Sequence, residues 1–257
     1  MDLNKELEIS KKLAIIAGQK IMEIYKKDFD IEYKDDDSPL TEADKKSNKI
    51  IVKGLIKEFP EYAILSEESH DDFKRIKNDW CWIVDPLDGT KEFIKKNGEF
   101  TVNIALSYKK RPVVGVIYVP VKERLYFATK NNGAYLLDSN YQTKEIFVSD
   151  KIEKITLVMS RSHASDFVKN IIKKKKVTQT KRAGSSLKGC MVAEGKAEVY
   201  YRYNPTMEWD TAAMQCIVEE AGGIFKQLDD SEMMYNRKDS KNRKGFYILN
   251  DIKNKMH

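Results

Sequence analysis

The hydrophobic pattern of the first half of the chain predicts two helices packed against an antiparallel sheet. Apolar residues recur at steps of three and four over residues 3–24 and again over residues 43–59, as is typical of amphipathic helices. Thr41 is expected to cap the second helix, with Asp44 three residues further on. Alternating apolar segments over residues 101–137 then predict antiparallel strands joined by turns.

The second half of the chain has a different pattern of hydrophobic segments. Short strand-like segments alternate with helical ones, which is typical of an α/β arrangement. One helix is predicted to follow residues 161–163 and to end near Lys173, and another covers residues 208–221. The length of 257 residues is sufficient to bury a substantial core. We therefore expect a single domain over residues 1–257, formed by an α+β lobe at 1–150 and an α/β lobe at 151–257.

The composition excludes several classes of protein. The chain is 41% hydrophobic and 33% charged, as is typical of a globular protein. No apolar stretch approaches the roughly 20 residues that span a bilayer, and acidic residues stand at the start, where a signal peptide would be basic. The three cysteines are widely spaced in apolar segments, as expected of buried thiols in a reducing compartment. We predict a cytoplasmic protein, with a peripheral position at the inner membrane face as the alternative.

The net charge of +6 comes from lysines distributed along the whole chain. The densest run, residues 173–176, is interpreted as a solvated helix end, because no RNA- or DNA-binding motif accompanies it. A mildly basic surface still favours a small polyanionic substrate. We expect no stable nucleic acid partner, no transmembrane segment, and a monomer or weak dimer.

The most informative stretch covers residues 80–90. Five apolar residues predict a buried strand, and the sequence Asp-Pro-Leu-Asp-Gly-Thr that follows predicts a tight turn. This turn would place the carboxylates of Asp85 and Asp88 at the edge of a sheet. Two anions held close together repel each other unless a cation lies between them. Taken alone, the stretch fits a metal site and a solvated turn equally well.

Three further carboxylates are candidates for the same neighbourhood. Glu67 follows a short strand at residues 63–65, and it would lie beside Asp85 if the two strands end at one sheet edge. Asp44 and Asp210 each stand at the start of a helix, where a carboxylate can also serve simply as a cap. Oxygen ligands without accompanying histidine or cysteine favour magnesium or manganese over zinc. Such a site suits the hydrolysis of phosphate esters by a metal-activated water.

Two other features suit this chemistry. The Thr90 hydroxyl can form a hydrogen bond with the attacking water, and Glu67 can accept the proton that the water releases. The sequence Gly184-Ser185-Ser186 opens a helix, and it is interpreted either as an anion site or as an ordinary serine cap.

These motifs resemble the inositol monophosphatase superfamily of lithium-sensitive, magnesium-dependent phosphatases. The resemblance covers essentially the whole chain and rests on four motifs in the order of the family, at residues 41–44, 66–69, 82–90 and 209–213. It implies a fold of the α/β (α+β) class, namely the layered α-β-α-β-α sandwich of the inositol monophosphatase and fructose-1,6-bisphosphatase type.

Within that superfamily the chain is most similar to 3'(2'),5'-bisphosphate nucleotidases of the bacterial CysQ type, through residues 91–106, 184–188 and 205–210. Such enzymes remove the 3'-phosphate of adenosine 3',5'-bisphosphate (PAP) and leave AMP, which relieves product inhibition in sulfate assimilation. The alternatives are an inositol monophosphatase or broad sugar phosphatase and, outside enzymes, a basic nucleic-acid-binding protein. The clustered carboxylates count against the last, because they would repel a phosphate backbone.

The resemblance also implies roles for individual residues and a cofactor of two or three Mg²⁺ ions, with Mn²⁺ as the alternative. The implied metal ligands are Glu67, Asp85, the Leu87 carbonyl, Asp88 and Asp210. The implied catalytic residues are Glu67, Thr90 and Asp44, the last serving a further metal or its waters. The implied contacts to a nucleotide bisphosphate substrate are Gly89, Thr90, His163, Ser185, Lys188, Arg202 and Asp210.

Two of these residues bear on substrate choice. Lys188 and Arg202 suit a second phosphate, which an inositol monophosphate lacks, although both could also be solvated surface cations. We expect substrate selection here, far from the metal-binding turn. One departure from the family is Met214, where a glycine is usual, and its larger side chain is expected to alter helix packing near the pocket.

Overall fold

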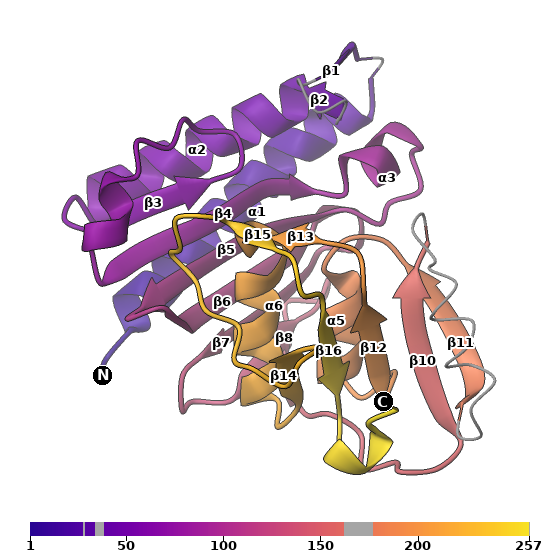
Figure 1. Ribbon diagram of the computed structural model, residues 1–257. Coiled ribbons are helices and arrows are strands. Elements are labelled where there is room, and N and C mark those ends of the chain that lie inside the picture. The colour runs from indigo at the N-terminus through magenta and orange to yellow at the C-terminus, as the bar shows by residue number, and fades with distance from the viewer. Residues whose placement is uncertain (28, 34–38, 162–176, 257) are drawn as a thin grey trace.

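The computed structural model describes residues 1–27, 29–33, 39–161 and 177–256 (Figure 1). The helices are α1 (Asn4–Tyr25), α2 (Glu42–Glu58), α3 (Thr90–Ile94), α5 (Leu187–Ala193) and α6 (Glu208–Glu220), with short 3-10 turns η1 (Lys74–Lys77), η2 (Pro120–Lys122) and η3 (Ile252–Asn254). The strands are β1 (Ile31–Tyr33), β2 (Pro39–Thr41), β3 (Ala63–Ser66), β4 (Trp80–Asp88), β5 (Thr101–Tyr108), β6 (Arg111–Val119), β7 (Arg124–Thr129), β8 (Ala134–Leu137), β9 (Thr143–Ile146), β10 (Ile155–Ser160), β11 (Val177–Ala183), β12 (Val199–Arg202), β13 (Thr206–Met207), β14 (Ile224–Gln227), β15 (Lys241–Asn242) and β16 (Phe246–Leu249).

A seven-stranded sheet in the order β3-β4-β5-β6-β7-β8-β9 forms the centre of the first half. Strands β3 and β4 are parallel, and the other neighbours are antiparallel. Side chains alternate between the two faces along β4, so that Trp82 and Val84 join the core formed with α1 and α2, whereas Cys81 and Ile83 join the core formed with α5 and α6. The predicted pair of helices against a largely antiparallel sheet is confirmed.

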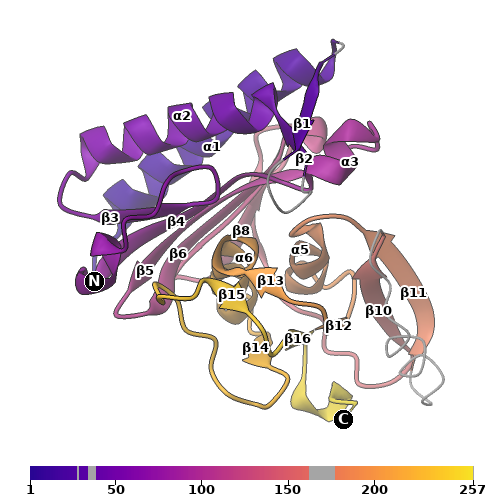
Figure 2. The same cartoon turned by 45° about the horizontal axis from the view of Figure 1, so that its top comes forward.

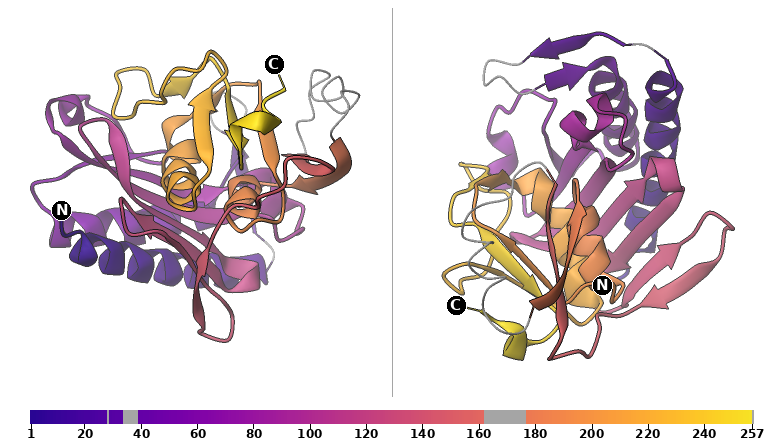
Figure 3. Two further views of the ribbon diagram at one scale, coloured as in Figure 1. Left: turned by 90° about the horizontal axis from the view of Figure 1, so that it is seen from below. Right: turned by 90° about the vertical axis from the view of Figure 1, so that its right-hand side faces the viewer.

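A second, five-stranded sheet in the order β11-β10-β12-β16-β14 belongs to the second half. It is mixed, because β10 is parallel to β11 and β12, whereas β16 is antiparallel to β12 and β14. Helices α1 and α2 cover the outer face of the first sheet, and α5 and α6 lie between the two sheets (Figure 2). The same layers are visible from two further sides (Figure 3). The predicted layered α/β sandwich is confirmed, while the helix predicted between residues 163 and 173 lies outside the described residues.

The predicted turn after Val84 is wrong in its position. Strand β4 continues to Asp88, and Asp85 and Asp88 both pair with β5 while the two residues between them form an irregularity in the register. Such a bulge accommodates Pro86, which lacks the N–H needed for a regular ladder. The sharp change of direction falls at Gly89, whose φ of 94° favours glycine. The bulge keeps both carboxylates at the end of one strand.

The apolar interior agrees with the sequence in a further respect. The three cysteines at positions 81, 190 and 216 are buried and form no disulfide, as predicted. Within the described ranges, no helix combines the length and the apolar character needed to cross a bilayer.

Candidate active site

Three carboxylates from distant parts of the chain meet between the two sheets. Asp85 and Asp88 come from β4 and Asp210 from the first turn of α6, and each offers an oxygen atom within 4.8 Å of the others. Burial raises the pKa of Asp85 well above its usual range, and the charges of Glu67, Asp88 and Asp210 add to this effect. Burial, followed by repulsion from Asp88, raises the pKa of Asp210 to about 7. Hard oxygen donors that repel each other in this way fit a divalent cation.

Asp88 is held by hydrogen bonds that the sequence analysis did not foresee. Its Oδ2 accepts from the Ser186 backbone N–H at 2.6 Å, the Ser186 hydroxyl at 2.7 Å and the Asn103 side-chain amide at 3.2 Å. The first turn of α5 therefore points at a carboxylate of the protein itself. Neither interpretation of the Ser-Ser motif describes this contact, because Ser186 orients Asp88.

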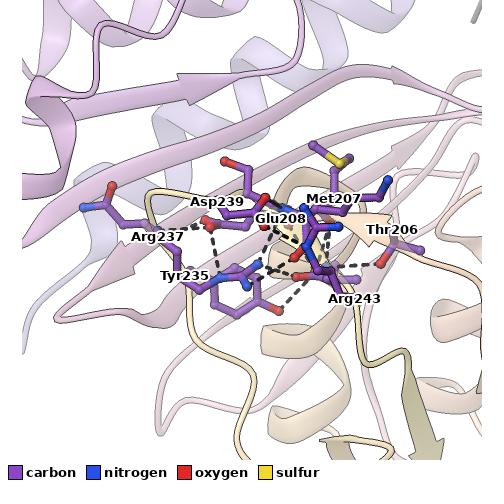
Figure 4. Close-up of polar contacts among 12 residues, drawn as sticks. Thr206, Met207, Glu208, Tyr235, Arg237, Asp239 and Arg243 are labelled. Carbon is purple, nitrogen blue, oxygen red and sulfur yellow. Dashed lines mark hydrogen bonds and ion pairs between the residues drawn. The ribbon is translucent and has the colours of Figure 1, made fainter. Parts of the chain in front are cut away.

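Asp210 is positioned by the start of α6. One of its oxygens accepts from the Met207 backbone N–H at 2.7 Å. The neighbouring Glu208 is completely buried, and it accepts from the backbone N–H groups of Asn236 at 2.6 Å and Arg237 at 3.0 Å and from the Arg237 side chain at 3.2 Å. Figure 4 shows Met207, Glu208 and Arg237 close together at the start of the helix. This network anchors the turn that presents Asp210, and the sequence analysis missed Glu208.

Asp44 accepts hydrogen bonds from two residues, Thr41 and Thr90. Its Oδ2 accepts from the backbone N–H of Thr41 at 2.8 Å and from the Thr41 hydroxyl at 2.6 Å, which confirms the predicted helix cap. Its Oδ1 accepts from the Thr90 hydroxyl at 3.1 Å. Burial raises the pKa of Asp44 even though these hydrogen bonds oppose the shift. Asp44 thus links α2 to the turn after β4.

Glu67 lies beside Asp85, as the neighbouring strand ends predicted. The Glu67 backbone N–H donates to the Val84 carbonyl at 3.1 Å, which continues the parallel pairing of β3 and β4. The Glu67 carboxylate is close enough to contribute to the raised pKa of Asp85. On the far side of the bulge, the Leu87 carbonyl oxygen lies 3.4 Å from the Thr90 hydroxyl oxygen, farther than the Asp44 oxygen at 3.1 Å.

A cavity of about 230 Å³ opens beside the carboxylates. The expected site residues that line it are Glu67, Asp88, Gly89, Thr90, Ser185, Lys188, Arg202 and Asp210. The expectation that substrate selection lies far from the metal-binding turn is therefore wrong, because both groups face one cavity. His163 lies outside the described residues.

Lys188 is a buried cation in the wall of this cavity. Its side chain is only 6% exposed, so the alternative of a solvated surface lysine is wrong. Its ammonium group donates to the Ser185 carbonyl. Burial lowers the pKa of Lys188 to about 8, the charge of Asp88 opposes the shift, and that of Arg202 adds to it. Lys188 and Arg202 bring two positive charges to the cavity that the carboxylates Asp88 and Asp210 also line.

Met214 also lines the cavity, where it packs against Gly189 of α5. A Cβ atom on Gly189 would lie only 2.2 Å from both Cγ and Sδ of Met214. The expected change in helix packing therefore takes a definite form: Gly189 provides the space that the larger side chain needs.

The fold and the site together define a layered α/β protein in which a cluster of carboxylates able to hold a metal ion lies between two sheets. The chain belongs to the inositol monophosphatase family, which matches residues 2–248. It is 44% identical to the 3'(2'),5'-bisphosphate nucleotidase CysQ of Buchnera aphidicola over 228 residues, which are 87% of this chain and 85% of that protein. It is 40% identical to the protein of the same name from Escherichia coli K12 over 240 residues, 92% of this chain and 96% of that one.

The solved structures agree with these relatives. The crystal structure of CysQ from Bacteroides thetaiotaomicron, described as a bacterial member of the inositol monophosphatase family, matches with a TM-score of 0.85 and 41% identity, and the match covers 96% of this chain and 98% of that chain. The predicted resemblance to the superfamily and to its CysQ branch is confirmed.

Proposed function

We propose that the protein is a magnesium-dependent phosphatase that removes the 3'-phosphate of adenosine 3',5'-bisphosphate and releases AMP and inorganic phosphate. The observation that carries this proposal is the shared cavity, in which a cluster of carboxylates faces the two cations Lys188 and Arg202. The carboxylates suit a metal-bound phosphate that is cleaved, and the two cations suit a second phosphate that is retained. The naming of relatives at 40–44% identity as bisphosphate nucleotidases supports the same substrate.

We assign the metal site to the carboxylate cluster and its immediate neighbours. The proposed ligands are Glu67, Asp85, the Leu87 carbonyl, Asp88 and Asp210, with Asp44 serving a further ion or its waters. Two or three Mg²⁺ ions, or Mn²⁺ in their place, would neutralise phosphate charge and lower the pKa of a bound water. The raised pKa values of Asp85 and Asp210 support this assignment, because they mark carboxylates whose charge the protein alone does not balance.

Thr90, Asp44 and Glu67 are proposed to handle the attacking water. The Thr90 hydroxyl donates its proton to Asp44 at 3.1 Å, so its oxygen remains available to accept a hydrogen bond from water. Asp44 thereby fixes the direction in which Thr90 acts. Glu67, which also lines the cavity, is the proposed acceptor of the proton that this water releases.

The remaining wall is proposed to bind the nucleotide. Lys188 and Arg202 would hold the 5'-phosphate, and burial of Lys188 strengthens that attraction, because water screens it less. Gly89, Ser185 and Asp210 line the intervening part of the cavity and are proposed to contact the ribose side of the substrate. His163 remains a proposed contact on sequence grounds.

The wider organisation stays a proposal as well. We infer two lobes, at residues 1–150 and 151–257, and this division is supported by the placement of the seven-stranded sheet before residue 150 and the five-stranded sheet after it. A cytoplasmic location, a monomer or weak dimer, and the absence of a stable nucleic acid partner remain predictions from the sequence.

The test compares phosphate release from three substrates: PAP, adenosine 3'-phosphate and inositol 1-phosphate, each with magnesium and with EDTA. We expect PAP to give the highest kcat/KM and EDTA to abolish activity. Lys188→Met should raise KM for PAP far more than for adenosine 3'-phosphate. Lys196→Met is the matched control, because Lys196 is 48% exposed and pairs with Glu194 at 3.0 Å. Faster turnover of inositol 1-phosphate would identify an inositol monophosphatase instead, and activity in EDTA would exclude the metal mechanism.

A further inference from the structure

Tyr200 lines the same cavity as the cations Lys188 and Arg202 and the carboxylates. Its side chain is only 3% exposed, and its ring meets Phe246 edge-on, with centroids 5.4 Å apart. The Lys188 ammonium lies 5.5 Å from the centroid of the Tyr200 ring. Arg202 follows two residues later in the same strand, and alternate residues of a strand face the same side of the sheet. Tyr200 is therefore built into the same wall as both cations.

The hydroxyl of Tyr200 differs from those of two other buried tyrosines, Tyr126 and Tyr235. Tyr126 donates to Glu194 at 3.1 Å and Tyr235 donates to Gln215 at 2.7 Å. The Tyr200 hydroxyl donates no hydrogen bond to any residue that the structure describes, and Tyr200 lines the cavity. A buried hydroxyl usually has a partner. A ligand in the cavity would supply that partner.

The surroundings of the Tyr200 hydroxyl keep it protonated and therefore able to donate a hydrogen bond. Burial raises the pKa of Tyr200, and the charges of Asp88 and Asp210 raise it further while Arg202 opposes them. The hydroxyl therefore keeps its proton at every physiological pH. Lys188, in contrast, has a pKa near neutrality, at about 8. Tyr200 thus offers a donor that does not depend on pH beside a cation that does.

We propose that Tyr200 is a further substrate-binding residue, whose hydroxyl donates a hydrogen bond to the second phosphate held by Lys188 and Arg202. This inference rests on the proposed function, since it concerns the phosphate that the enzyme retains. This hydrogen bond would add specificity for a bisphosphate as well as affinity, because the Tyr200 hydroxyl is held in place by the sheet and its ring packs against Lys188 and Phe246. A monophosphate without this second group would leave the hydroxyl without its acceptor.

The test is the variant Tyr200→Phe, which removes the hydroxyl and keeps the ring and its contacts. A hydrogen bond to a charged group is strong enough for its loss to raise KM for PAP about tenfold. We expect kcat to change by less than about twofold and KM for adenosine 3'-phosphate to stay unchanged, because that substrate lacks the 5'-phosphate. Tyr201→Phe is the matched control, since Tyr201 belongs to the core on the other face of this sheet.

The outcomes separate this inference from the proposed function. A wild-type enzyme that does not hydrolyse PAP would remove the proposed function itself. If the wild type hydrolyses PAP and Tyr200→Phe leaves its KM unchanged, the function stands and the role of Tyr200 is wrong. An equal rise of KM for PAP and adenosine 3'-phosphate would show a general effect on the pocket and would also overturn the assignment. Thermal unfolding of both variants verifies that each is folded.

Discussion

Replacing one carboxylate of the cluster should stabilise the protein when metal is removed. The oxygens of Asp85, Asp88 and Asp210 lie within 4.8 Å of one another. At that separation and an effective dielectric constant of about 20, each pair of charges repels by about 3 kcal/mol. Asp85→Asn removes the charge of the most buried member and keeps the oxygen that accepts from the Leu87 N–H at 3.1 Å. The variant tests whether the three carboxylates destabilise the metal-free protein, as expected of a cation site, or instead stabilise the fold.

The expected gain is smaller than the full repulsion, because protonation relieves part of it in the wild type. We expect Asp85→Asn to be more stable than the wild type by roughly 2–3 kcal/mol in EDTA at pH 8, which corresponds to a rise in Tm of about 4–10 °C for a chain of this size. Magnesium should raise the Tm of the wild type, since it binds only the folded state, and should have much less effect on the variant. The assay is thermal unfolding in EDTA and in a magnesium series.

The pH dependence follows from the raised pKa values. Between its ordinary pKa and its raised pKa, an aspartate binds more protons in the folded state than in the unfolded state. The metal-free wild type should therefore lose stability as the pH rises from about 4 towards 7, where the raised pKa of Asp210 lies. The advantage of Asp85→Asn should be small at pH 5 and largest at pH 8.

The control for this experiment is Asp79→Asn, which makes the same chemical change at an exposed position outside the cluster. It should leave both the Tm in EDTA and the response to magnesium unchanged. The reasoning is refuted if Asp85→Asn is no more stable than the wild type in EDTA at pH 8, or if its advantage is the same at pH 5.

Three further predictions concern other parts of the site. Because the pKa of Lys188 is lowered to about 8, kcat/KM for PAP should fall between pH 7 and pH 9 as the ammonium loses its proton, and Lys188→Met should lack this fall when the two pH profiles are compared. Glu208→Gln should lower the free energy of unfolding in urea by about 2–4 kcal/mol, because it breaks the ion pair of the buried Glu208. It should also raise the magnesium concentration needed for half-maximal activity, and an unchanged magnesium requirement would show that this network does not position Asp210. Gly189→Ala should cost about 1–3 kcal/mol by overpacking, and adding Met214→Ala should restore most of that loss; additive effects of the two changes would refute the contact.

Much of the fold could be predicted from the periodicity of apolar residues. The helical steps of residues 3–24 correspond to α1, and the alternation after residue 101 corresponds to β5 through β8. Strand β14 was not predicted, because its four residues carry no alternation that stands out after the glycine pair that ends α6. The position of the turn after Val84 was also wrong. A proline usually indicates the end of a strand, but here β4 continues past Pro86 and its pairing with β5 contains a bulge at that point.

The site was predictable to the extent that chemistry is carried by residue type and order. The carboxylates could be found because acids at strand and helix ends stand out from their apolar surroundings. Ser186, Glu208 and Tyr200 could not be found in the same way, because their roles depend on how two sheets are placed against one helix layer. The burial of Lys188 could not be predicted either, because a lysine in a lysine-rich chain gives no local sign that it lines a cavity.

The hydrogen bond from the Ser186 backbone to Asp88 has a consequence for how the protein matures. It spans 98 residues and joins an element of the first sheet to the helix layer that the second sheet covers. A growing chain that has completed only the first sheet already displays Asp85 and Asp88, but Asp210 and the donors that orient Asp88 have not yet been synthesised. The three carboxylates that could hold a metal ion can therefore come together only after the chain has been synthesised as far as α6. A product terminated before α6 would contain Asp85 and Asp88 but would lack Asp210, the third carboxylate of the cluster.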